Sequence, residues 1–196
     1  MKKLQNKKGF TLVEMIVVLA IIAILIALLA PNVARLIKNA QTTSDNAKAK
    51  TVMNTAQAYA TDAVADGNNI ISGSVQAIGT KAYFILIDET SGNTNMKNAF
   101  YPSTYTGTPP AFLDGSGDAY LPKNTVKGDD AVAVYFSLEG AVMGTVFYQG
   151  TGATARIKAV SGVCPEDANS AGTEFTTGKF RGGTFNTGTG SVTAAP

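Results

Sequence analysis

The sequence predicts an α+β fold, in which a long N-terminal helix packs on an antiparallel β-sheet head. Three observations lead to this prediction. An apolar run of 21 residues, 10–30, follows a short basic leader. Residues 32–66 contain neither Gly nor Pro and are rich in Ala, which favours a continuing helix. Residues 131–160 alternate apolar and polar positions between turn signals, as antiparallel strands do.

The apolar run reads FTLVEMIVVLAIIAILIALLA, and its polar members are Thr11 and Glu14. A helix of this length spans roughly 31 Å, which is about the hydrocarbon thickness of a bilayer. The run is apolar on all sides, whereas a helix on the surface of a soluble protein has one apolar stripe. We therefore predict a membrane-spanning helix. Four leader lysines, Lys2, Lys3, Lys7 and Lys8, place the N-terminus in the cytoplasm and the rest of the chain across the membrane.

Two simpler explanations of the run are an ordinary secretory signal peptide and an unprocessed anchor. Signal peptidase needs small residues one and three positions before its cut. A cut after Ala30 would place Leu28 at the third position and Pro31 beyond the bond. A cut after Ala34 would place Asn32 there, so a signal peptide is disfavoured. Hydropathy does not exclude the unprocessed anchor.

Glu14 separates these alternatives, because a carboxylate inside a membrane costs roughly 2.5–3.5 kcal/mol and usually has a partner. Neither Lys nor Arg lies between Phe10 and Asn32. The nearest cation would be a new α-amino group, made by cutting the chain between Gly9 and Phe10. Basic residues before a small residue, with an acid four residues into the product, fit such a cut.

The stretch KKGFTLVEMIVVLAIIAILIALLAP resembles the class III signal of type IV pilins and pseudopilins, and the resemblance covers about the first 55 residues. It implies that a prepilin peptidase cleaves after Gly9 and methylates Phe10. It also implies that Pro31 is the family's helix-bending proline. We expect Glu14 to pair with the α-amino group of Phe10 in a neighbouring subunit during assembly. The alternative is a Glu14 that only reaches to the membrane interface.

The helix is expected to kink or open locally at Pro31, which cannot donate a backbone hydrogen bond. Residues 32–67 are predicted to form an amphipathic stem that ends at Gly67. Val52, Ala56, Tyr59 and Ala63 recur at helical spacing and form the face that a head domain would cover. A helix over residues 10–66 would extend roughly 85 Å, which suits the core of a fibre.

One position of the apolar run departs from the family. Many relatives have a Gly about eight residues before the Pro, where this chain has Ala23. Gly in place of Ala weakens a helix by roughly 1 kcal/mol. We therefore expect residues 23–31 to melt less on polymerisation than in Gly-bearing relatives. A density map of the fibre tests this, and a fully extended segment there would contradict it.

The head is predicted over residues 68–196. Fourteen of the sixteen Phe and Tyr residues lie between Tyr83 and Phe185, enough for one compact core. Three strands of an antiparallel meander are predicted within 131–160, with turns at residues 138–140 and 150–152. This sheet would pack on the stem face from Val52 to Ala63. The apolar segment 82–87 is either a strand or a helix.

Three further segments of the head give weaker signals. Residues 91–128 are rich in Gly, Pro, Ser, Thr and Asn and are expected to be a long surface excursion. Within it, Asp114 and Asp118 are a weak candidate for a calcium site, and a plain turn is the favoured alternative. Cys164 has no partner for a disulfide in its chain and is expected to be a small buried apolar residue. The Gly/Thr-rich tail, 182–196, is expected to be flexible or an edge strand.

Composition excludes several classes of function. The chain has no His and one Cys, which disfavours imidazole catalysis, thiol–imidazole catalysis and His-ligated metals. Without the four leader lysines, 12 basic residues face 14 acidic ones, so a nucleic-acid surface is not indicated. No cofactor is expected, and an enzyme is the weakest hypothesis. The acid pairs Asp129–Asp130 and Glu166–Asp167 are better explained as solvated turns.

The leading hypothesis is therefore a structural subunit, favoured as a major pilin, of a type IV pilus for adhesion or motility. Its expected partners are other copies of itself, prepilin peptidase, the inner-membrane assembly machinery and, before assembly, lipid. We expect a single-pass precursor in the cytoplasmic membrane and an extracellular fibre. The alternatives are a minor pilin, a secretion or competence pseudopilin, or a binding module at the pilus tip.

Overall fold

The computed structural model describes residues 9–78, 82–114, 119–152, 155–164 and 182–193. The chain divides into two units, one up to Gln41 and one from Thr42 onward. Helix α1, Leu12–Ala65, contributes its first part to the first unit and its last part to the second.

The first unit is a helix with every residue from Gly9 to Gln41 exposed. Its large apolar side chains are open to solvent, for example Leu12 at 75%, Leu19 at 64% and Leu28 at 66%. Among the described residues, α1 is the one helix long and apolar enough to cross a membrane. Helix α1 passes through Pro31 without a break, so the predicted local opening is absent from the described chain. The alternative form of that prediction, a kink at Pro31, stays a prediction.

The second unit begins with the last part of α1, whose buried side chains lie on one face of the helix, most of them three or four residues apart. This part of α1 buries Asp45, Ala49, Val52, Ala56, Tyr59, Ala60 and Ala63. The helix ends where Gly67 adopts a φ of +80°. There the amides of Asn68 and Gly67 bond back to the carbonyls of Ala63 and Val64, at 2.9 and 3.0 Å. This is a Schellman cap, and it confirms Gly67 as the predicted stop.

A seven-stranded antiparallel sheet forms the centre of the second unit, in the order β1-β2-β5-β6-β7-β8-β9. Its strands are β1 Gln76–Ile78, β2 Ala82–Ile87, β5 Asp130–Ser137, β6 Val142–Gln149, β7 Ala155–Gly162, β8 Thr184–Asn186 and β9 Ser191–Thr193. The predicted meander corresponds to β5, β6 and β7 and is confirmed. The undecided segment 82–87 is a strand, β2, paired with β5 along its whole length.

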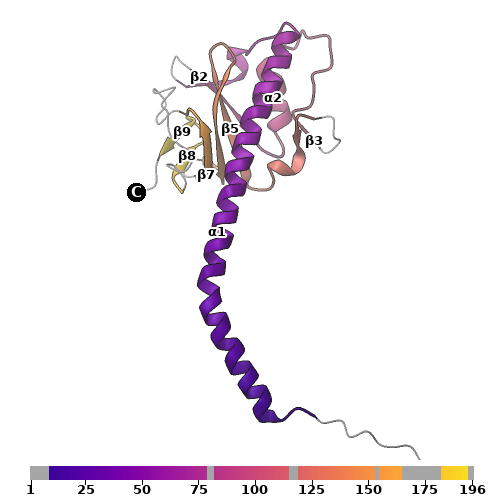
Figure 1. Cartoon of the computed structure of the whole chain (residues 1–196). Helices are drawn as coiled ribbons and strands as arrows, with labels where there is room; N and C mark the ends of the chain where they lie inside the picture. The colour runs from indigo at the N-terminus through magenta and orange to yellow at the C-terminus, as the bar shows by residue number, and fades with distance from the viewer. Residues whose placement is uncertain (1–8, 79–81, 115–118, 153–154, 165–181, 194–196) are drawn as a thin grey trace, which may run out of the picture. The chain divides into compact units, whose positions relative to one another are not determined.

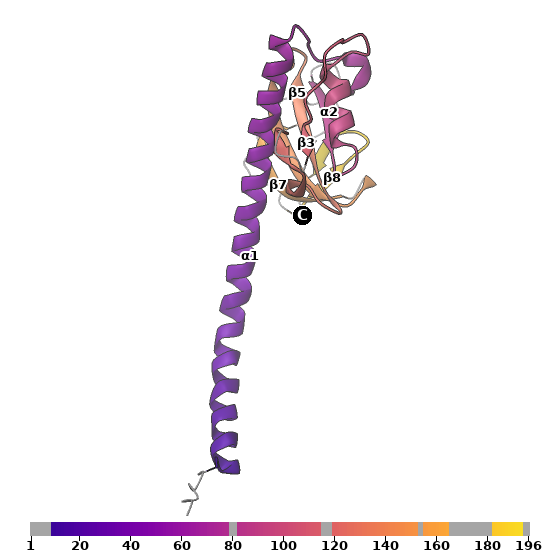
Figure 2. The same ribbon diagram turned by 90° about the vertical axis from the view of Figure 1, so that its right-hand side faces the viewer.

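The first face of the sheet packs against α1, as predicted (Figures 1 and 2). Phe136, Phe147 and Val134 of the sheet share one core with Val52 and Tyr59 of α1. The hydroxyl of Thr145 is fully buried and donates to the Ala49 carbonyl at 2.9 Å. A buried hydroxyl without an acceptor would be costly, so this bond fixes the distance between helix and sheet.

The opposite face has a second core, because the sheet curls so that the β8–β9 hairpin lies over the strands at its other side. The Tyr135 hydroxyl donates to the Gly190 carbonyl at 2.6 Å. Phe185 of β8 packs on Tyr148 of β6, with ring centroids 4.5 Å apart. A Cβ at Gly190 would lie 2.7 Å from the Phe84 ring, so the hairpin approaches β2 closely.

The expectation that the C-terminal tail is flexible is therefore wrong for residues 182–193. The alternative expectation, an edge strand, holds for this segment. Phe185 and Val192 of this segment are buried in the second core. Their burial outweighs the conformational freedom that the Gly/Thr-rich composition suggests. The last three residues of the chain lie outside the described part.

The expectation of a surface excursion over 91–128 is also wrong for most of that segment. It holds helix α2, Gly92–Phe100, and the parallel pair β3, Leu113–Asp114, with β4, Leu121–Pro122. A 3₁₀ turn follows at Lys123–Thr125. Eight buried residues anchor the segment to the first core: Met96, Ala99, Phe100, Tyr101, Phe112, Leu113, Leu121 and Val126. The sequence did not reveal these anchors, because they are widely spaced among the polar residues of the segment.

Asp88 organises the start of α2, and its carboxylate gives a testable pH effect. The carboxylate accepts from the amides of Thr90 and Ser91, at 2.8 and 2.6 Å, and from the Ser91 hydroxyl at 2.7 Å. Burial alone raises the pKa of Asp88, but the bonds from Ser91 and Thr90 outweigh burial and lower it. A carboxylate with a lowered pKa stabilises the fold above its unfolded pKa, and this contribution is lost as the pH falls through the folded pKa.

We expect Asp88→Ala to lose about 1 kcal/mol of unfolding free energy at neutral pH. The difference in unfolding free energy between the variant and the wild-type protein should shrink as the pH falls below the pKa of an ordinary aspartate, which is about 4. Urea unfolding of the full chain in detergent micelles at several pH values measures this. Asp129→Ala, at an exposed site, is the control. A loss that does not change with pH would contradict the role of the charge.

Cys164 is fully buried in the second core, as expected of a small apolar residue. Burial raises the pKa of its thiol, which keeps the reactive thiolate scarce. We expect a thiol reagent to leave the native protein unlabelled and to label one site after unfolding in urea. Rapid labelling of the native protein, followed by mass spectrometry, would contradict this burial.

Candidate functional site

The predicted cleavage site precedes α1 in a non-helical, exposed stretch of chain. Gly9 and Phe10 are outside the helix, and the Phe10 side chain is 79% exposed. No heavy atom lies within 4 Å of where a Cβ at Gly9 would stand. A peptide bond in such a stretch is open to an enzyme on both sides. The two predicted processing residues are thus both exposed, and their cleavage stays a prediction.

Thr11 and Glu14 form a capping box at the first turn of α1. The Thr11 hydroxyl accepts from the Glu14 amide at 3.2 Å. In return, Glu14 Oε2 accepts from the Thr11 amide at 2.7 Å and from the Thr11 hydroxyl at 2.8 Å. These bonds satisfy backbone donors that a helix start leaves without partners. The box fixes both the helix start and the position of the carboxylate.

Sequence reasoning missed this box because it sought only a cationic partner for Glu14. The signal was present: Thr-x-x-Glu directly before an apolar run is the sequence pattern of a capping box. The carboxylate therefore has partners within its own chain. Both Thr11 bonds go to Oε2, and no hydrogen bond between described residues reaches Oε1. Oε1 is the atom that a further donor could approach.

Pro31, the third predicted assembly residue, lies more than four helical turns beyond Glu14. It has no amide hydrogen to offer the carbonyl of Ala27, four residues earlier. Next to it, the Asn32 side-chain amide bonds to the Leu28 carbonyl at a long 3.5 Å. The structure places Pro31 on the same helix as Glu14 but does not bring the two into contact, since they lie far apart along α1.

The calcium candidate falls largely outside the described part of the chain. Asp118 is not described, and neither is the side chain of Asp114. Among the described residues, no group of three or more His, Cys, Asp or Glu side chains could hold a metal ion.

Comparison with known protein families gives a match at the N-terminus. Residues 4–30 match the family described as the prokaryotic N-terminal methylation motif. No curated protein and no solved structure matches the chain. The matched segment covers the leader, the capping box and most of the apolar run, and the helix-on-sheet layout of the chain fits a type IV pilin. The N-terminus thus carries the methylation motif of the class III signal of type IV pilins, and this motif supports a pilin- or pseudopilin-like precursor with an apolar anchor.

Proposed function

We propose that this chain is a structural subunit of a type IV pilus, and that it is a major pilin. The observation that carries the proposal is the fully exposed apolar part of α1 directly behind a methylation motif. Such a surface must be covered by lipid before assembly and by other helices afterwards, because apolar area in water is unfavourable. The motif's family is made of structural subunits, which agrees with a non-enzymatic role.

The proposed maturation begins in the cytoplasmic membrane, with the N-terminus in the cytoplasm. Prepilin peptidase removes residues 1–9 by cutting between Gly9 and Phe10 and methylates the new α-amino group. Residues 10–31 then span the membrane, residues 32–67 form the stem, and residues 68–196 form the head. The assembly machinery transfers the subunit into an extracellular fibre built of its own copies.

Glu14 is proposed to set the register of assembly. The capping box turns Oε2 toward Thr11 of the same chain and leaves Oε1 for the Phe10 ammonium of a neighbouring subunit. Attraction between opposite charges is strong in a medium of low dielectric constant, and an unpaired carboxylate there is costly. A subunit one step out of register would lose this pair.

Mass analysis of the N-terminus of material sheared from cells tests the proposal. The expected result is a mature chain that begins with methylated Phe10 and is the dominant species of the fibres. A trace of this chain among fibres of another subunit would favour a minor pilin, a pseudopilin or a binding module at the tip. A soluble monomer that retains residues 1–9 would overturn the proposal.

A further inference from the structure

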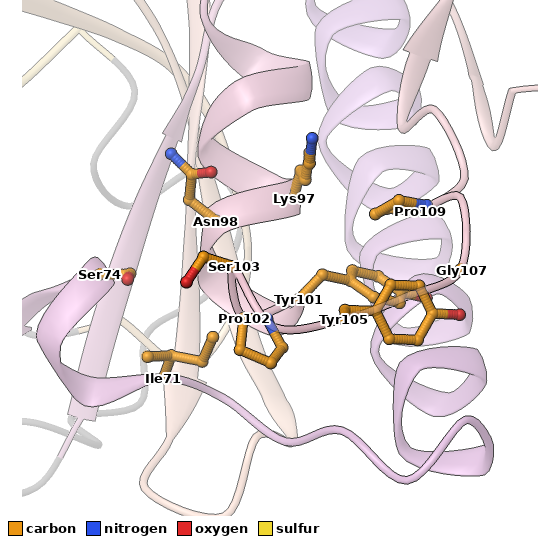
Figure 3. Close-up of a pocket in the computed structure, with 10 residues that line it drawn as sticks. All are labelled: Ile71, Ser74, Lys97, Asn98, Tyr101, Pro102, Ser103, Tyr105, Gly107 and Pro109. Atoms are coloured by element: carbon orange, nitrogen blue, oxygen red, sulfur yellow. The ribbon is translucent and has the colours of Figure 1, made fainter.

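A cavity of about 520 Å³ lies in the head, where the end of α2 meets the loop that follows it (Figure 3). The 3₁₀ turn Ser72–Ser74 closes one side. Lys97 and Asn98 come from α2, and the loop contributes Ser103, Tyr105 and Pro109. The volume of the cavity lies within the range of small-molecule sites, roughly 300–1,000 Å³.

Contacts that the lining residues make with one another and with neighbouring elements fix the walls of the cavity. The Ile71 amide donates to the Ala99 carbonyl at 2.8 Å and holds the 3₁₀ turn against α2. The Tyr105 hydroxyl donates to Asp66 of α1 at 3.1 Å, and its ring packs on Tyr101 at 4.8 Å between centroids. A Cβ at Gly107 would lie 2.7 Å from the Tyr105 ring, so the loop wraps around this tyrosine. The site is therefore formed before any ligand arrives.

Polar side chains line the cavity without partners of their own. The residues Ser74, Lys97, Asn98 and Ser103 are exposed to solvent, and their side chains make no hydrogen bond or ion pair with another described residue. Together they offer hydroxyl groups, an amide that donates and accepts, and one ammonium group. In Figure 3, Ser74, Asn98 and Ser103 lie on one side, and Lys97, Tyr105 and Pro109 lie on the other.

The charge and the apolar surface of the lining narrow the class of ligand. Lys97 is the one charged group among the described lining residues, and Asp66 lies behind the lining, where it accepts from the Tyr105 hydroxyl. An anionic group is therefore favoured at Lys97 itself, away from Asp66. The Tyr105 ring and Pro109 supply a flat apolar surface, and an aromatic face attracts the positive edges of C–H groups.

We propose that this cavity binds an acidic saccharide of one or two rings. Its carboxylate would contact Lys97, its hydroxyls would bond to Asn98, Ser74 and Ser103, and the C–H face of a ring would lie on Tyr105. This proposal goes beyond fibre assembly and does not rest on it, because every group it uses belongs to the head.

Calorimetric titration of the full chain tests the proposal, in a zwitterionic detergent that contains no sugar. The probes are a disaccharide that ends in glucuronic acid, the matching disaccharide that ends in glucose, and acetate. We expect saturable binding of the acidic disaccharide, about fivefold weaker binding of the neutral one, and none of acetate. Absence of saturable binding of the acidic disaccharide, or equal binding of acetate, overturns the proposal.

Two variants locate the binding. Lys97→Gln should bring the affinity for the acidic disaccharide down to that for the neutral one, whereas Lys50→Gln on the exposed side of α1 should leave both unchanged. Gly107→Ala should weaken both sugars, because the new methyl group displaces the Tyr105 ring. An unchanged affinity in Lys97→Gln places the ligand elsewhere and overturns the proposal.

Discussion

Glu14→Gln is expected to be cleaved and methylated normally and to yield at least about tenfold fewer fibres. Glutamine keeps the capping box, since its side-chain oxygen still accepts from Thr11, and removes only the charge. The helix start should thus be unchanged while the proposed pair with the Phe10 ammonium is lost. Quantifying sheared fibres against the processed membrane pool measures the effect.

Thr11→Val is the matched control, because it removes the hydroxyl of the capping box and keeps the Glu14 charge. Loss of a helix cap costs about 1 kcal/mol, so a smaller fall in fibre yield is expected. Comparing the fibre yields of the two variants distinguishes the two roles of the Glu14 carboxylate, which are pairing with the Phe10 ammonium and capping the helix. Wild-type assembly of a normally processed Glu14→Gln would rule out the pairing, and a larger loss in Thr11→Val would assign Glu14 to the cap alone.

The sequence was sufficient to predict those elements that have a single clear hydrophobic periodicity or a single local motif. The face of α1 from Val52 to Ala63, the stop at Gly67 and the meander β5–β7 follow from helical spacing, a left-handed glycine and strict alternation. The N-terminal motif combines a basic leader, a small residue, an acid and an apolar run in fixed order. Each of these signals is local, so no long-range contact was needed to find it.

The sequence was insufficient where distant residues decide the structure. Residues 91–128 have the composition of a loop, yet Phe100 and Phe112 bury themselves against Tyr59 of α1, with ring centroids 6.0 and 5.6 Å away. The hairpin β8–β9 is held in place because the ring of Phe185 packs on the ring of Tyr148. The cavity at Lys97 needs α2, a 3₁₀ turn and a loop together, and no single segment of sequence indicates it.

Gly162→Ala should be among the most damaging single changes in the head, with a loss of about 2–5 kcal/mol of unfolding free energy. Gly162 ends β7 opposite Gly144 of β6 and has a φ of +77°, a conformation in which a side chain is strained. An added Cβ would collide with the Met143 carbonyl oxygen and lie 2.8 Å from the Gly144 Cα. Both atoms belong to backbone, which cannot rotate away as a side chain can.

Gly128→Ala is the matched control, because Gly128 has a φ of +65° but open space around its Cα. It should lose only the conformational part, about 1–2 kcal/mol. The chain has no Trp, so near-ultraviolet circular dichroism of tyrosine follows urea unfolding of the full chain in detergent micelles. A lower midpoint in Gly162→Ala than in Gly128→Ala assigns the difference to the close approach of β6 and β7. Equal midpoints would mean that backbone conformation alone requires glycine at position 162, and that the two strands can separate at little cost.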